Sequence, residues 1–149
     1  MGLWLLFVGI GFPMIIMASI TYRYMMFYFD CRNSCLKAAK APTFTQAEAT
    51  AASVFSQDQA AWNGVTGTET INILIKPLAG GAPTVSTTPL TTVDSDNNIY
   101  FIQAVCNGQI NPLVSLGSYM GLNIPGLTGP YPVQVVVEFY AENPDGLTN

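Results

Sequence analysis

Residues Met1 to Tyr22 read MGLWLLFVGIGFPMIIMASITY and contain no charged side chain. A helix of about 20 apolar residues, rising roughly 1.5 Å per residue, crosses a hydrocarbon core about 30 Å thick. We therefore expect a membrane helix followed by a small tethered domain. The apolar run is longer than that of a signal peptide, and no basic residue precedes it.

The same helix is predicted to continue far beyond the apolar run, from about Leu3 to about Ala41, where Pro42 stops it. Such a helix is about twice as long as the bilayer core is thick, so its second half must leave the membrane as a stem and pack on something. Pro13 lies inside the span and should kink or locally unwind it. The expected division is residues 1–41 for helix and stem and residues 42–149 for the extramembrane domain.

The remainder predicts one further helix and a small sheet. The helix spans Thr45 to about Trp62, and Thr45 and Glu48 have the spacing of a capping box. Three segments have strand patterns, Glu69–Leu78, Asn98–Cys106 and Val133–Tyr140. The predicted fold class is therefore α+β, with a long N-terminal transmembrane helix that continues into a stem and packs on a small antiparallel sheet.

Charge is sparse and unevenly placed along the 149 residues, of which 9% are charged. Four of the five basic residues follow the apolar run, namely Arg23, Arg32, Lys37 and Lys40. We interpret these four as a juxtamembrane cluster that contacts lipid head groups. From Ala41 onward one lysine stands against eight acids, a balance that excludes nucleic acid as a partner.

The orientation of the chain follows from two opposing signals. The positive-inside rule would place the basic cluster in the cytoplasm, unless a basic leader once preceded Met1. The domain itself is polar, rich in Thr, Asn and Gly, and nearly free of lysine. On this composition we predict a single-pass protein whose domain lies outside the cytoplasm, in the periplasm or at the cell surface.

Three cysteines leave two readings open. Cys31 and Cys35 share one helix face, and Cys106 ends a predicted strand, so a bridge from either helix cysteine to Cys106 would pin helix to sheet. Alternatively, all three are small buried hydrophobic residues. A metal site is not expected, because the chain has no histidine and three thiols alone rarely complete a zinc site.

Catalytic patterns are weak. The absence of histidine excludes a Ser–His–Asp site. Ser34 and Lys37 match the S-x-x-K pattern of penicillin-recognising enzymes, but the companion motifs are missing. Asp94–Asn98 resembles the opening of a calcium loop, yet Ile99 and Val105 stand where glycine and glutamate are required. We predict no enzyme, no cofactor and no small-molecule substrate.

Packing against other helices is the predicted role of the apolar segment. Small residues in a membrane helix allow close approach of a neighbour. We assign the assembly face to Gly9, Pro13, Met17 and Ile20.

Three stretches carry a resemblance to a known family. They are FVGIGFPMIIMASITYRY (Phe7–Tyr24), CRNSCLKAAKA (Cys31–Ala41) and INPLVSLGSYMGLNIPGLTGPYPVQVVVEF (Ile110–Phe139). The apolar segment with its proline, the small-residue stem and the Pro-Leu loop before a last strand resemble TadE/TadG-like minor pilins, which belong to the type IV pilin-like proteins. The chain departs from the pilin pattern at its start, where Leu5 stands in place of the usual glutamate and no acid precedes Asp30.

The resemblance implies a non-enzymatic structural subunit. Its partners would be membrane lipid and other membrane or pilin-like subunits, including copies of itself, assembled through the N-terminal helix into a pilus or secretion-type filament. The alternative is a single-pass accessory subunit that stabilises a large membrane complex, such as a respiratory or photosynthetic assembly. The missing acid favours this alternative, whereas the Pro-Leu loop and the last strand favour the pilin-like subunit.

Overall fold

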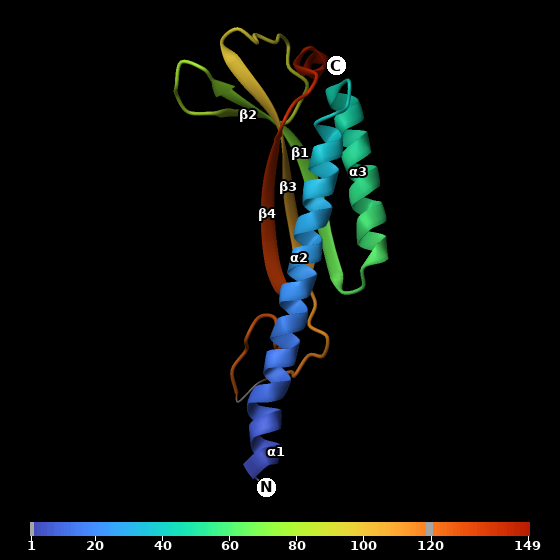
Figure 1. Ribbon diagram of the computed structural model, residues 1–149, viewed down its shortest axis with the longest axis vertical. Helices are drawn as coiled ribbons and strands as arrows, with labels where there is room; N and C mark the ends of the chain where they lie inside the picture. The colour runs from blue at the N-terminus through green and yellow to red at the C-terminus, as the bar shows by residue number, and fades with distance from the viewer. Residues whose placement is uncertain (1, 119–120) are drawn as a thin grey trace.

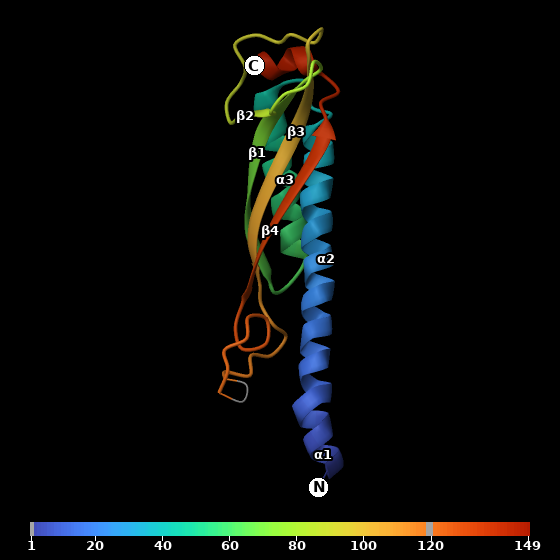
Figure 2. The ribbon, with the colours of Figure 1, turned by 90° about the vertical axis from the view of Figure 1, so that its left-hand side faces the viewer.

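A computed structural model describes residues 2–118 and 121–149 as a long helical rod lying along a four-stranded antiparallel sheet, with a second helix beside the rod (Figures 1 and 2). The expected α+β class is confirmed. The helical elements are α1 (Gly2–Leu6), the π-helical turn η1 (Phe7–Gly11), α2 (Phe12–Ala38), α3 (Phe44–Ala61) and the 3-10 helix η2 (Pro144–Thr148). The strands are β1 (Val65–Pro77), β2 (Thr84–Ser86), β3 (Asn98–Ile110) and β4 (Tyr131–Tyr140).

The rod is helical from Gly2 to Ala38 and is widened at one point. In η1 the backbone N–H of Phe12 donates to the carbonyl of Phe7, a five-residue spacing in place of the usual four. Pro13 follows at once, and its ring lacks an N–H and crowds the carbonyl four residues earlier. The wider turn relieves that crowding. The local unwinding expected at Pro13 is therefore confirmed.

A short turn joins α2 to α3, and both helix ends at this turn differ from the predicted positions. The rod ends at Ala38, three residues before the expected end, and the Ala39 N–H donates to the Cys35 carbonyl over 2.9 Å. The cap of α3 is Thr43 and not Thr45, because the Thr43 hydroxyl accepts from the Gln46 N–H at 3.2 Å. The predicted capping box is therefore wrong.

The sheet has the order β2-β1-β3-β4, with every neighbouring pair antiparallel. All three predicted strands are present, and β1 and β3 are longer than expected at 13 residues each. The short β2 was not predicted, since it falls in a Pro/Thr/Ser/Gly-rich connection; it pairs with Ile73 to Ile75 of β1. One face of the sheet packs on the C-terminal half of α2, which we call the stem. The buried core between them includes Phe27, Cys31, Cys35, Ile73 and Ile102.

Phe27 fits the sheet through a pair of glycines. Gly67 of β1 and Gly108 of β3 lie directly opposite each other, and the fully buried Phe27 ring packs over both. A Cβ added at Gly67 would lie 2.8 Å from that ring, and one added at Gly108 would lie 2.7 Å from it. Glycine is therefore required at both positions for the helix to approach the sheet this closely.

Candidate functional site

The apolar half of the rod projects beyond the sheet, with the N-terminus at the opposite end of the molecule from the C-terminus (Figures 1 and 2). Large apolar side chains are exposed along it, namely Leu3, Trp4, Leu6, Phe7, Val8, Ile10, Met14, Ile15 and Met17. Among the described residues, the helix Gly2–Ala38 is the one long and apolar enough to cross a membrane. An apolar surface of this kind marks a site of contact with lipid or protein.

The four residues predicted as the assembly face do not share one environment. Gly9 lies in the π-helical turn and Pro13 lies two residues after its end, and both are half-buried. Met17 is exposed, but Ile20 is only 6% exposed, and its Cδ1 atom is 2.8 Å from where a Cβ of Gly126 would lie. Ile20 therefore packs against the chain's own β3–β4 loop.

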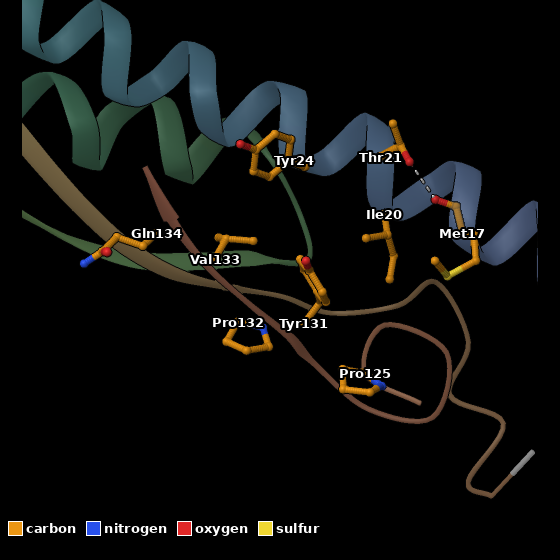
Figure 3. A pocket seen from close by; sticks show the side chains of 9 residues that line it. All are labelled: Met17, Ile20, Thr21, Tyr24, Pro125, Tyr131, Pro132, Val133 and Gln134. Atoms are coloured by element: carbon orange, nitrogen blue, oxygen red, sulfur yellow. Dashed lines mark hydrogen bonds between the residues drawn. The ribbon is translucent and has the colours of Figure 1, made fainter. Parts of the chain in front are cut away.

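A groove of about 440 Å³ separates α2 from that loop and from the start of β4. Figure 3 shows Met17, Ile20 and Tyr24 on the helix facing Pro125 and Tyr131 across it. The Thr21 hydroxyl is tied back to the Met17 carbonyl at 3.1 Å. Because this bond occupies the Thr21 hydroxyl, the walls of the groove are mostly apolar.

The basic residues are spread along the stem and do not form one cluster. Arg23 donates from its guanidinium to the Asn111 carbonyl and packs beside Gly64. Arg32 stacks 5.6 Å from the centre of the Phe139 ring. Roughly 21 Å of helix axis separates Arg23 from Lys37, so the four residues are distributed along the stem, and their contact with lipid head groups stays a prediction.

The three cysteines are free thiols in the core beneath the stem. The Cys35 thiol donates to the carbonyls of Ile102 and Val137 at 3.4 and 3.5 Å, and its burial raises its pKa to about 12. Cys31 and Cys106 hydrogen-bond to each other, and this contact together with burial raises the pKa of Cys106. Cys31 is thus the helix cysteine placed to bridge to Cys106, and the disulfide itself stays a prediction.

A carboxylate shares this thiol pocket. The Glu69 Oε1 atom accepts from the Ser34 hydroxyl and lies 3.8 Å from the Cys106 Sγ atom. Its Oε2 atom is buried without a hydrogen-bond partner among the described residues. Burial raises the pKa of Glu69, and the hydrogen bonds from Ser34 and Cys106 oppose that rise. Glu69 therefore links β1 to the stem at an electrostatic cost.

A second buried acid lies on the opposite side of the stem, in a groove between α2 and α3. Asp30 is only 4% exposed, and within the part of the chain that the structure describes its Oδ2 atom has no hydrogen-bond partner. Asp58 lies nearby and accepts from the Asn33 amide at 2.7 Å. Burial and the charge of Asp58 raise the pKa of Asp30 from 3.8 to about 6, against a hydrogen bond from the Trp62 side chain.

The weak catalytic and calcium patterns gain no support from the geometry. Ser34 is buried against Glu69 whereas Lys37 is exposed, so the two lie on different sides of the stem. Asp94 accepts from the Asn97 side chain at 2.8 Å within its own turn. In the part of the chain that the structure describes, no group of three or more His, Cys, Asp or Glu side chains is placed to hold a metal ion.

Both buried acids were missed by the sequence reading, and for Asp30 a signal exists. Phe27, Cys31, Ser34 and Ala38 form a buried stripe at helical spacing, and Asp30 lies beside it as the one acid before Glu48. A lone acid next to an apolar stripe indicates a buried charge. Glu69 has no comparable signal, because its burial depends on the stem lying over β1.

Comparison with protein-family models, with curated protein sequences and with solved structures finds no match to this chain.

Proposed function

We propose that this protein is a non-enzymatic structural subunit that inserts its N-terminal helix into a bilayer or a helical filament core and holds its domain outside the membrane. The observation that carries the proposal is the exposed apolar half of the rod, which projects beyond the sheet (Figure 2). In water, so many exposed apolar side chains would be a strong cause of aggregation.

The stem supports this role as a rigid mount. Phe27, Cys31 and Cys35 are fully buried in the same core as Ile73 and Ile102 of the sheet. Close packing of this kind fixes the direction in which the apolar half points. A subunit that assembles through one helix needs that direction fixed relative to its domain.

Between the two kinds of assembly, we favour the pilin-like filament subunit. Its support is the resemblance of the apolar segment, the small-residue stem and the Pro-Leu loop to TadE/TadG-like minor pilins. An accessory subunit of a larger membrane complex is the second candidate. It is favoured by the absence of an acid before Asp30, because pilin-like proteins use such an acid during assembly.

The test is a fractionation of cells that produce the full chain. Sheared extracellular fibres are pelleted, membranes are dissolved separately in mild detergent, and the chain is located by mass spectrometry. The variant Ile10→Lys places a charge on the exposed apolar helix, and Val85→Lys places one on the exposed strand β2. A lysine at the centre of a membrane helix costs about 3 kcal/mol. Ile10→Lys should therefore be lost from both the fibre fraction and the membrane fraction, whereas Val85→Lys should be recovered like the wild type.

Each outcome decides between the candidates. Recovery with sheared fibres supports the filament subunit. Recovery only in detergent, in company with large membrane proteins, supports the accessory subunit and overturns the filament. Equal recovery of the wild-type chain and Ile10→Lys in the soluble fraction, outside both the fibres and the membranes, contradicts the membrane role itself.

A further inference from the structure

We propose that the β3–β4 loop, residues 111–118 and 121–130 in its described parts, is a second membrane contact that lies at the boundary between lipid head groups and acyl chains. This inference rests on the proposed insertion of the N-terminal helix. It assigns the loop to lipid and not to the solvent-facing surface of the domain.

Two contacts fix the level of the loop along the rod. The uncharged run ends at Arg23, whose guanidinium donates to the carbonyl of Asn111, the first residue of the loop. Farther along, Gly126 packs on Ile20, one turn earlier on the helix. The loop therefore lies beside the last turns of the uncharged run (Figure 1). If the first charge marks the membrane border, this part of the loop is on the lipid side of it.

The chemistry of the loop matches that position. No charged residue occurs between Asp96 and Glu138, which encloses the whole loop. Leu113 and Leu122 are 60% and 61% exposed, and Val114 is exposed as well. Exposed leucines in an uncharged segment beside an apolar helix extend one apolar surface across both elements.

The loop also satisfies many of its own polar groups, which an irregular segment near lipid must do. Thr128 is the centre of this network: its hydroxyl accepts from the Ile124 N–H at 2.9 Å, and its carbonyl accepts from the Ser115 hydroxyl at 2.6 Å. The Leu116 N–H donates to the Leu127 carbonyl at 3.2 Å. These bonds lower the cost of placing the backbone in a poorly hydrated layer.

Aromatic side chains surround the base of the sheet at the same level. Tyr22 and Tyr24 are exposed on the rod, Tyr131 is exposed at the end of the loop, and Trp62 is exposed at the end of α3. Trp62 lies in one groove with Arg23 and Leu113. Tyr and Trp are enriched at membrane–water boundaries, where the ring is in the acyl region and the polar atom reaches the head groups.

The experiment measures the depth of single tryptophans in bilayers that contain brominated lipids, which quench nearby indole fluorescence. Leu122→Trp and Leu113→Trp are each placed in a full chain carrying Trp4→Phe and Trp62→Phe. The matched control is Leu78→Trp, at the opposite end of the sheet, where the native leucine is 56% exposed. A chain with Trp62→Phe alone retains Trp4 and reports on the helix. Circular dichroism checks that each variant is folded.

We expect the loop tryptophans to be quenched at least about twofold more than Leu78→Trp, with lipids brominated near the head group more effective than lipids brominated deep in the chain. If Trp4 is quenched but the loop tryptophans are quenched no more than Leu78→Trp, the loop inference is overturned and insertion of the helix is still supported. An unquenched Trp4 would instead contradict the proposed function. Shielding of the loop that increases with protein-to-lipid ratio would assign its surface to a second copy and also overturn the inference.

Discussion

Asp30 has an acidic side chain in a buried environment that does not favour its charged form. A buried carboxylate without a full set of hydrogen bonds is costly, and here the like charge of Asp58 adds to that cost. Arg32 lines the same groove, but among the described residues the one ion pair is Lys76 with Glu138. The charge on Asp30 is therefore not compensated by a salt bridge within the described chain.

This imbalance predicts a stability that depends on pH. The pKa of Asp30 is raised in the folded chain, so folding favours the protonated form, and the stabilisation is fully present below about pH 4 and lost as the pH rises through about 6. Asp30→Asn removes the charge and keeps an acceptor for Trp62. In detergent at pH 7.5 we expect its melting temperature to exceed that of the wild type by about 3 °C, and the two to converge near pH 4.

The matched control for this prediction is Asp96→Asn, which removes one negative charge from an exposed turn. Its melting temperature should follow that of the wild type across the whole pH range. A wild-type chain that is more stable than Asp30→Asn at pH 7.5 would mean that the Asp30 charge has a favourable partner in the folded chain.

At the scale of elements, local patterns account for most of the fold. The uncharged run and the β-branched residues of β4 identify the rod and the strongest strand without any tertiary information. The short strand β2 could not be predicted, because three residues of Thr-Val-Ser have a strand conformation here only through pairing with Ile73 to Ile75. Burial of Ile20 was also beyond the sequence, since it depends on where a distant loop folds back.

The contact between stem and sheet depends on the opposed glycines Gly67 and Gly108. Gly108→Ala places a methyl group against the Phe27 ring and near the Thr66 carbonyl, 2.9 Å away. We expect this substitution to lower the free energy of unfolding by about 2 kcal/mol, as for other overpacked cores. Chemical denaturation of the detergent-solubilised chain measures the loss.

A double-mutant cycle tests the cause of that loss. With Phe27→Leu already present, Gly108→Ala should cost about 1 kcal/mol less, because the smaller side chain leaves room for the methyl group. Gly129→Ala is the matched control, since a Cβ there meets no atom of the described residues within 4 Å. An equal cost of Gly108→Ala in both backgrounds would assign the damage to the backbone of the strands and not to the helix contact.

The whole molecule is a helical rod with a domain packed on one half, while the other half of the rod is exposed and apolar (Figure 2). The sequence predicts this division from its charge pattern alone, but it cannot say which faces of the rod remain free after the loop has folded beside it. Ile10 and Met14 are four residues apart and 57% and 66% exposed, so they lie on one free face. This face is where we expect a neighbouring helix to pack.

That expectation can be tested by cross-linking the full chain in its native membrane. The native thiols are fully buried, and Cys35 has a pKa of about 12, so they should not react and need not be replaced. With copper phenanthroline as oxidant, Met14→Cys and Ile10→Cys should give disulfide-linked dimers, whereas Val85→Cys on β2 should remain monomeric. Dimers of this chain support self-assembly through the rod, and adducts with a different protein support the accessory subunit. If Met14→Cys and Ile10→Cys stay as monomeric as Val85→Cys, lipid and not protein covers this face, and assembly through it is contradicted.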